Sequence, residues 1–500
     1  MKLTPVRRAA VALLAAALLG PPPALAQLPT LGDAEMSTSA ERRLGEKIAR
    51  ELYRDPDYID DPVLVEYVRA IWEPLLQAAR SRGELTSELD ERFAWQVLLG
   101  KDRSVNAFAL PGGWLGLHLG LVSVTTTRDE LASVLAHELS HVTQRHISRL
   151  VNQEKRQAPL MIAAMILGAL AARKNSDAAN AVLSGSQAVA VQNQLNFSRE
   201  MEREADRVGY GVLTQAGFDP AGFVSMFEKL QQASRLNDSG AYPYLRTHPM
   251  TTERSADLQA RLQLTSRERT DVSSPAALEH ALMAARARVL SSGGVDGQRA
   301  LLSEAASLQA GAPSLRRAAA LYAGSLAASR MRDTGLAVTY AQRLLDEQRE
   351  VPAAARQARL LLAEVSLAGG RTERALTLLD AVSRSRPELL LRAQARLASG
   401  GASEVAQLLQ SWVATQPRDA MAWQVLAAAY HSQGQTLRAV RAEAEAQVAL
   451  LDYAAAVDRL KAAQDLMRRG AASGDHIEAS IIDTRTRQVE SLLREQALER

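Results

Sequence analysis

His137-Glu138-Leu139-Ser140-His141 is the segment whose residue types and spacing most clearly indicate chemistry. Residues four apart lie on one face of an α-helix, so His137 and His141 can bind one metal ion together. Glu138 projects beside them, where a carboxylate can polarise a metal-bound water. The alternative is a surface helix with two unrelated His residues, but only 8 of the 500 residues are His. The pattern therefore predicts a zinc site that needs a third ligand.

The sequence around the motif has the features of a helix. Thr127 and Glu130 form a T-x-x-E capping box, which marks a helix start. Apolar residues then recur at helical spacing and predict one buried stripe. They are Leu131, Val134, Leu135, Leu139 and Val142.

A second helix supplies the candidate third ligand. It is expected over residues 198–217, and within it Glu202 and Asp206 are four apart and face the same way. Glu202 would complete a site of two His and one Glu, and Asp206 could hold the far nitrogen of a ligand His. Glu200 and Glu204 offer the same spacing on a different face. The alternative for either pair is a solvated face with neighbouring Arg partners.

The longer zinc signature of the metzincins does not fit. It requires Gly three residues after the second His and a third His three residues beyond that. Gln144 and Ile147 occupy those positions. His146 is one residue away from the required place, so we expect it to be an exposed helix residue.

Residues 1–26 have the composition of an export signal. A basic start is followed by the apolar segment 9–19 and by Ala24-Leu25-Ala26, a small-x-small cleavage site. The apolar segment is too short to span a bilayer comfortably. We therefore predict export to the periplasm or beyond, with the mature chain beginning at Gln27.

Composition limits the classes of function. Outside residues 1–26 the basic and acidic residues are equal in number, 56 of each, so charge gives no support for nucleic-acid binding. Aromatic residues make up only 4% of a chain rich in Ala and Leu, which favours helices over sheets. With no Cys there are no disulfides. A length of 500 residues predicts at least two domains.

The region before the motif is predicted to contain two helices and a small sheet. An amphipathic helix is expected over residues 40–53, and a second begins within 61–72. Segments 92–99, 105–110 and 114–122 are predicted strands separated by turn residues. The predicted fold class is α+β, mainly α: a metalloprotease-type domain with a small sheet, followed by an all-α repeat domain.

Two segments between the site helices have other signatures. Residues 158–172 form the most apolar segment after the leader, but fifteen residues are too few for a standard transmembrane helix. A buried core helix is the favoured interpretation, and peripheral contact with a membrane or a cover over the site is the alternative. The polar stretch 174–196 is a candidate loop or lid. Charged residues and Ser273-Ser274-Pro275 then mark a boundary between domains at 27–270 and 275–500.

The C-terminal half shows a repeat of about 34 residues, the period of tetratricopeptide units. Residues at the expected positions of one unit are Trp423, Leu426, Ala427, Tyr430 and Ala439. Val405 and Pro417, and also Ala375 and Pro387, repeat a 12-residue offset. We predict a curved helical stack whose concave face binds partners, and a simple helical bundle is the alternative.

The order H-E-x-x-H and then E-x-x-x-D resembles the gluzincin zinc metallopeptidases, which include the HtpX-like and CAAX-prenyl-processing endopeptidases. Residues 106–113 (NAFALPGG) and 198–209 (SREMEREADRVG) carry the resemblance further, as does Thr247-His248-Pro249 followed by Arg254. It covers residues 40–265. Since no long transmembrane segment is present, the chain is more similar to the soluble periplasmic branch that carries a tetratricopeptide tail.

This resemblance implies one zinc ion per chain, bound by His137, His141 and Glu202. Glu138 would be the catalytic base, and Asp206 would orient His137. His248 would either help to stabilise the oxyanion or occupy the fourth zinc position and keep the enzyme latent, with Arg254 beside it. A plain loop His is the alternative. A strand edge is expected to hold an extended peptide through Gly112, Gly113, Trp114, Leu115 and Gly116.

The resulting hypothesis is a periplasmic zinc endopeptidase. By resemblance, its substrates would be misfolded or stalled outer-membrane proteins, and the repeat tail would bind their assembly machinery. The competing hypothesis is a chaperone or assembly scaffold with a latent or silent zinc site. An intact Glu138 argues against a purely structural site, since such a site needs no base.

Overall fold

The computed structural model describes residues 36–153, 198–235, 241–264, 274–307, 314–471 and 476–497. The predicted export signal, the apolar segment 158–172 and the polar stretch 174–196 lie outside the described residues. Within the described ranges, no helix is both long and apolar enough to cross a membrane.

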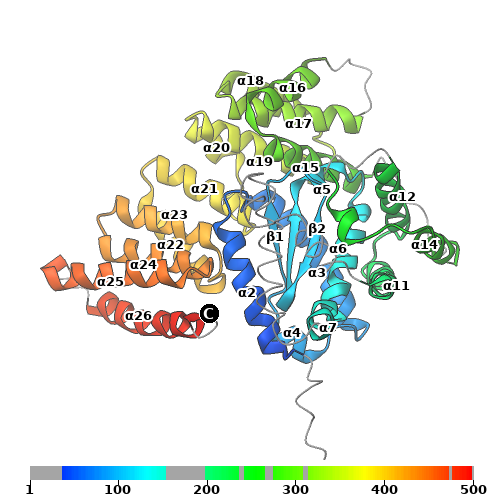
Figure 1. Cartoon of the computed structure of the whole chain (residues 1–500). Helices are drawn as coiled ribbons and strands as arrows, with labels where there is room; N and C mark the ends of the chain where they lie inside the picture. The colour runs from blue at the N-terminus through cyan, green and yellow to red at the C-terminus, as the bar shows by residue number, and fades with distance from the viewer. Residues whose placement is uncertain are drawn as a thin grey trace, which may run out of the picture.

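A small three-stranded sheet lies at the centre of the N-terminal half (Figure 1). Its strands are β1 (Gln96–Gly100), β2 (Ala107–Leu110) and β3 (Trp114–His118), in the order β1-β3-β2. β3 pairs with β1 in parallel and with β2 in antiparallel orientation. The central strand is thus β3, and β2 is an edge strand.

Two predicted strands were too long. The first was expected from residue 92, but α4 (Ser87–Arg92) precedes β1 because Thr86 caps a short helix there with its side chain. The third was expected to reach residue 122, but β3 ends at His118 and α5 (Leu119–Val124) follows. A short, fully buried apolar segment has the same pattern in a strand and in a helix, so periodicity alone could not separate them.

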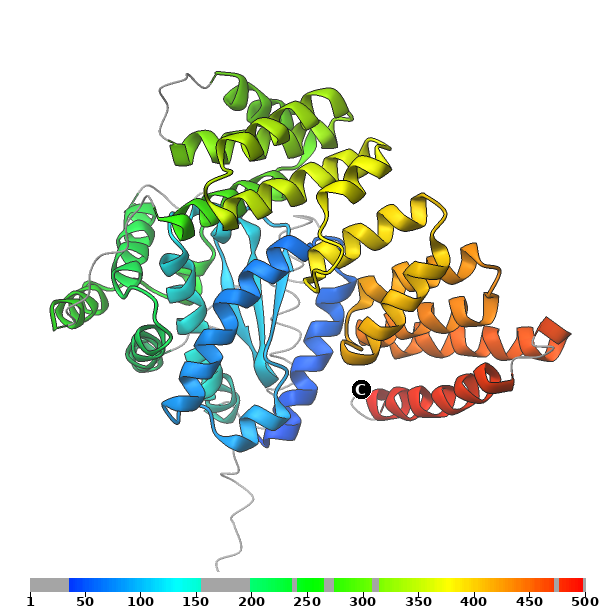
Figure 2. The same ribbon diagram turned by 180° about the vertical axis from the view of Figure 1, so that it is seen from behind.

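Helices surround the sheet, and α3 crosses it in Figure 2. The α-helices of this half that have not yet been given are α2 (Thr38–Arg54), α3 (Pro62–Ser81), α6 (Arg128–Thr143), α7 (His146–Gln153), α11 (Arg199–Gln215), α12 (Ala221–Arg235), α13 (Tyr244–Thr247) and α14 (Thr252–Leu264). The helices predicted at 40–53 and 198–217, the one expected to begin within 61–72, and the motif helix starting at Thr127 are therefore all present.

The helix that carries the motif, α6, is buried on every side. Thr127 accepts a hydrogen bond from the backbone N–H of Glu130, and the Glu130 carboxylate accepts one from the N–H of Thr126. Every residue from Asp129 to Thr143 is buried. The expectation of a single apolar stripe was too narrow, because α3, α11 and α12 all pack on this helix. Its polar residues must consequently be satisfied inside the protein.

The C-terminal half is a succession of paired helices that follows an arc around the sheet region (Figure 1). These helices are α15 (Pro275–Ser291), α16 (Gly294–Ser307), α17 (Ser314–Arg330), α18 (Thr334–Glu347), α19 (Pro352–Ala368), α20 (Thr372–Leu378), α21 (Arg386–Ala398), α22 (Ala402–Thr415), α23 (Ala420–Ser432), α24 (Thr436–Ala449), α25 (Tyr453–Leu466) and α26 (His476–Ala497). A mainly helical protein with one small sheet confirms the predicted fold class.

The first tail helices share a core with the sheet region. One continuous apolar cluster includes Leu75 of α3, Leu121 of α5, Leu282 of α15 and Leu361 of α19. Within it lies the guanidinium of Arg286, only 3% exposed, at 2.6 Å from Asp61 and 2.7 Å from Glu364. Asp61 is also the N-cap of α3. One buried cation therefore joins α15, α19 and the start of α3.

Replacing Arg286 by Ala is expected to lower the free energy of unfolding by about 3–5 kcal/mol, since it leaves Asp61 as an unpaired buried charge. Urea unfolding followed by circular dichroism measures the change. Arg288→Ala is the matched control on the same helix: this side chain is 40% exposed and pairs with Glu304, so its loss should cost at most about 1 kcal/mol. Equal effects of the two substitutions would contradict the structural role given to Arg286.

Candidate metal centre

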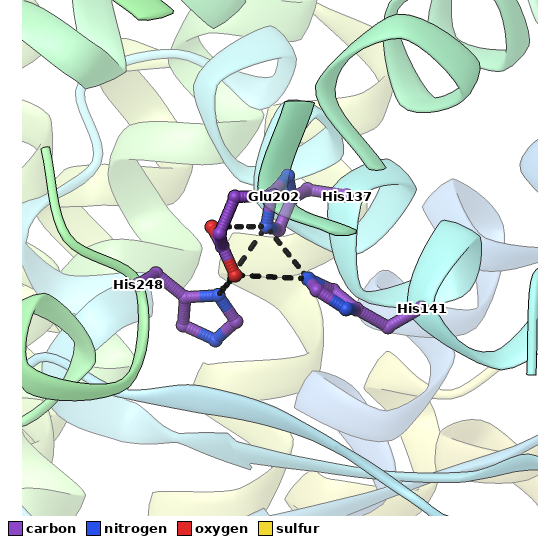
Figure 3. A group of neighbouring side chains, drawn as sticks. All are labelled: His137, His141, Glu202 and His248. Carbon is purple, nitrogen blue, oxygen red and sulfur yellow. Dashed lines mark hydrogen bonds and ion pairs between the residues drawn. The ribbon is translucent and has the colours of Figure 1, made fainter. Parts of the chain in front are cut away.

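Four side chains from three parts of the chain meet in one buried group (Figure 3). His137 and His141 come from α6, Glu202 from the first turn of α11, and His248 directly follows α13. One ligand atom from each can be chosen so that all lie within 4.8 Å of one another. The structure thus brings together the three predicted ligands and adds His248 to them.

The separations within the group match those of ligands around a single ion. The Nε2 atoms of His137 and His141 are 3.0 Å apart, and each is 3.5 Å from an oxygen of Glu202. His248 Nδ1 lies 3.0 Å from Glu202 Oε1 and 3.3 Å from His137 Nε2. Tetrahedral Zn²⁺ with bonds of about 2.0–2.1 Å would hold its ligand atoms about 3.3 Å apart.

Close packing of α11 on α6 allows these distances. Ser198 caps α11 by accepting a hydrogen bond from the N–H of Met201, so the helix begins just before Glu202. Further along the same helix, a Cβ atom at Gly209 would lie 3.2 Å from the backbone of Ala136 and from the Cα of His137. Gly at this position lets the two helix backbones approach each other beside the site.

Asp206 and Arg254 contact the ligand residues and orient them. Asp206 Oδ1 is 3.0 Å from His137 Nδ1, so the Nε2 atom of that ring is the one directed at the site. Arg254 binds Asp206 with two nitrogens, at 2.6 and 2.8 Å, and reaches Glu202 Oε2 at 2.8 Å. This places Asp206 where the sequence predicted it. Arg254, predicted as a possible latch or oxyanion residue, directs its guanidinium at these two carboxylates.

The charges of the site suit a divalent cation. The carboxyl groups of Glu138, Glu202 and Asp206 are all at least 98% buried, and Arg254 pairs with the last two. Three carboxylates and one guanidinium leave two negative charges, which Zn²⁺ would neutralise. Two imidazoles and a carboxylate are also a ligand set that zinc prefers. The residues present therefore fit zinc in number, spacing and charge.

Ionisation of the group follows from burial and pairing. Burial disfavours the charged form of His137, but the carboxylates of Asp206 and Glu202 outweigh it and raise its pKa to about 9. Burial and the neighbouring His137 lower the pKa of His141 well below its usual value. Burial alone would raise the pKa of Glu202 and of Asp206, but contacts with His248 and His137 lower the pKa of Glu202, and contacts with Arg254 and His137 lower that of Asp206. Without metal, the protonated ring of His137 thus supplies part of the positive charge that a zinc ion would bring.

Glu138 lies between the ligand group and the sheet. Its Oε2 accepts a hydrogen bond of 2.8 Å from the backbone N–H of Ala109 on β2. Its Oε1 lies 3.4 Å from His248 Nε2 and makes no hydrogen bond within the part of the chain that the structure describes. One carboxylate oxygen is therefore held by the edge strand, and the other is available to accept a proton.

The strand predicted to hold a peptide at its edge, residues 114–118, is not an edge strand in the structure. Residues 114–118 form β3, which has strands on both sides and cannot accept another. The predicted substrate-binding residues have structural roles instead: Gly112 and Gly113 take φ of 71° and 84° against α2 and Phe93, and Trp114 and Leu115 are buried core residues. Gly116 leaves space for the ring of Phe108. The outer edge of β2, next to Glu138, faces the site.

His146 was expected to be exposed, but it is fully buried. Five residues along one continuous helix correspond to a rotation of about 140° away from His141. Here α6 ends at Thr143, Arg145 takes a φ of +53°, and a new helix begins at His146. This turn brings His146 back against His141. The isolated positive φ at a non-Gly residue left no clear signal in the sequence.

Comparison with known proteins agrees with this geometry. Residues 68–262 match Peptidase family M48, so this part of the chain is similar to that metallopeptidase family. The predicted relation to gluzincin-type peptidases is thereby confirmed. The match contains all four residues of the group and Glu138, Asp206 and Arg254.

The chain is also similar to proteins named beta-barrel assembly-enhancing protease. The one from Escherichia coli is 34% identical over 237 residues, 47% of each chain, and the one from Yersinia pestis is 35% identical over 242 residues, 48% of each. Mitochondrial metalloendopeptidase OMA1 of Arabidopsis thaliana is 33% identical over 170 residues, which cover 34% of this chain and 32% of that protein. The chain spans about half the length of the two bacterial relatives and a third of the plant protein.

Zinc binding at about pH 7 is expected to release roughly one proton per ion, because the metal displaces the proton of His137, whose pKa is about 9. The other groups with shifted pKa contribute none: His141 is neutral, and Glu202 and Asp206 are ionised, before zinc arrives. Calorimetry in buffers of different ionisation enthalpy measures the number. The number of protons released per zinc ion should fall towards zero as the pH is raised above about 9. A number that does not change with pH would contradict the raised pKa of His137.

Proposed function

We propose that this chain is a zinc metalloendopeptidase. The observation that carries the proposal is the position of Glu138, a buried carboxylate with one oxygen unbonded beside a two-His, one-Glu group. A purely structural zinc site needs no such base. The similarity of residues 68–262 to Peptidase family M48 supports the same conclusion.

The chain's own residues would divide the chemistry of peptide hydrolysis among them. A bound zinc ion supplies a Lewis acid that polarises a carbonyl group and lowers the pKa of water. Glu138 Oε1 would accept a proton from the attacking water and give it to the leaving amine. The Ala109 N–H fixes the other oxygen of Glu138, while Asp206 and Arg254 keep His137 and Glu202 directed at the ion.

An extended peptide would pair with the outer edge of β2. No described strand occupies that edge, and Ala109 in the middle of it already contacts Glu138. A peptide paired along Ala107–Leu110, with the Ala109 N–H kept on Glu138, would thus pass directly beside the base. Strand pairing recognises main chain rather than side chains, which suits substrates in an unfolded or stalled state.

Replacing Glu138 by Gln is expected to abolish cleavage of an unfolded protein, a loss of at least 10²–10⁴-fold if Glu138 is the general base. Zinc content should stay near one per chain, because Glu138 is not a ligand. Both are measured on the purified chain, by gel assay and by metal analysis. Glu202→Gln is the contrasting variant, which should lose zinc and cleavage together. Cleavage by Glu138→Gln at the unaltered rate would overturn the proposed mechanism.

We further propose that His248 occupies the fourth position and keeps the site latent. Its Nδ1 lies within the ligand group, and its ring stacks on Tyr244 with centroids 4.4 Å apart. A fourth protein ligand leaves no place for water or substrate. Of the two roles predicted for His248, this geometry favours the latch, and a latched zinc protein also accommodates a scaffold or chaperone activity.

His248→Ala should therefore raise peptidase activity and weaken zinc binding, since it opens one position at the cost of one ligand. Initial rates at saturating zinc separate the two effects. A lower rate at saturating zinc would instead support the oxyanion role, and an unchanged rate would exclude both. Arg246→Ala is a suitable control because this exposed residue lies on α13 outside the ligand group.

The cellular setting follows from the same proposal. A cleaved signal at residues 1–26 would deliver the protein to the periplasm, where misfolded or stalled outer-membrane proteins are the proposed substrates. The names of the bacterial relatives support this setting. The helical pairs from α15 onwards would form the tetratricopeptide-like tail that binds the assembly machinery. Crosslinking of the exported chain in cells, read by the identity of captured partners, tests both statements.

A further inference from the structure

His146 contacts the ligand His141 and links it to Glu204, and we call this hydrogen-bonded chain of three side chains the relay. Its Nδ1 atom is 2.9 Å from Nδ1 of His141, and its Nε2 atom is 3.1 Å from Oε2 of Glu204. Arg149 holds the same carboxylate oxygen at 2.8 Å. We propose that His146, braced by Glu204 and Arg149, positions His141 for metal binding. This inference rests on the zinc site of the proposed function.

Hydrogen-bond chemistry fixes the direction of the relay. If His141 offers Nε2 to a metal, its only ring proton is on Nδ1, which must then donate. His146 accepts at Nδ1 and therefore carries its own proton on Nε2, where a carboxylate oxygen of Glu204 accepts it. Every atom in the chain from His141 to Glu204 then has a partner of the right kind. The arrangement selects the tautomer of His141 that binds metal.

The backbone is arranged to produce this contact. Arg145, with its φ of +53°, ends one helix and begins the next, and its side chain is fixed from another element: Nε lies 3.1 Å from Glu41 of α2, which is buried. The Arg145 side chain also reaches Ser148 at 3.3 Å. Left-handed backbone at a non-Gly residue is uncommon and persists where surrounding contacts hold it. The contacts of Arg145 hold the turn that aims His146 at His141.

The two ligand His residues are thus held in different ways. His137 is oriented by Asp206, a fully buried carboxylate paired with Arg254. His141 is oriented by a neutral ring, and the carboxylate at the far end of its relay is 28% exposed. In the sequence, Glu200 and Glu204 formed an alternative pair to Glu202 and Asp206. In the structure Glu204 connects to the site through His146, while Glu200 is exposed.

The test measures zinc affinity by competition with a chelator of known strength, so it does not depend on peptidase activity. His146→Leu removes the acceptor and should weaken binding about 10- to 100-fold. His146→Gln should recover part of this loss, because its amide oxygen can accept from His141. Glu204→Ala should cost several-fold, and Glu200→Ala, one helical turn away, should cost nothing. The absorption spectrum of the Co²⁺ form should shift in His146→Leu if the ligand geometry changes.

Unaltered affinity in His146→Leu would overturn the inference, as would equal losses in Glu204→Ala and Glu200→Ala. Thermal unfolding of the metal-free variants checks their fold. If His146→Leu does not fold, Glu204→Ala becomes the deciding variant, because the partly exposed Glu204 side chain can be removed with less damage to the core. A loss of zinc affinity in Glu204→Ala supports the relay, and no loss contradicts it. Failure of the unaltered chain to bind zinc would instead refute the proposed function.

Discussion

The guanidinium of Arg254 is the interaction on which the metal centre depends. It binds both oxygens of Asp206 and one oxygen of Glu202, and these two carboxylates are four residues apart on α11. Without a cation between them and the His pair, two buried negative charges would repel each other and would be costly to desolvate. Arg254 comes from α14, so the docking of that helix determines where α11 can place its ligand. The ring of Phe227, 4.9 Å from the guanidinium carbon, fixes it further.

Local periodicity predicted much of this centre, and non-local geometry explains what it missed. His137, His141, Glu202 and Asp206 are pairs at i and i+4, so helix geometry alone places each pair on one face. The order of the strands depends on pairing between segments, and for this reason β3 was taken for an edge. His146 depends on one left-handed residue, and Arg254 on a long side chain that crosses between helices. In each of these cases the deciding contact is absent from the local sequence.

The tail is bound to the sheet region along its length. Arg286, Arg356 and Arg386, from α15, α19 and α21, each pair with an acidic residue at the start of α3: Asp61, Glu66 and Asp60. Further along, Arg54 at the end of α2 meets Asp452 at 3.1 Å. These contacts, and the core shared by α15 and α19, make the first tail helices part of the structure that supports the metal centre. A predicted boundary near residue 275 divides the sequence pattern, but the apolar core continues across it.

The wide spacing of the ligands along the chain has a consequence for the order of folding. His137 and His248 are 111 residues apart, and Glu202 comes from a third element between them. In an unfolded chain only the His pair at i and i+4 can act together on an ion, so most of the affinity arises after α6, α11 and α14 have assembled. An ion bound this late stabilises the finished protein and contributes little to its earlier intermediates. Metal supply would then influence how long the folded chain persists far more than how fast it forms.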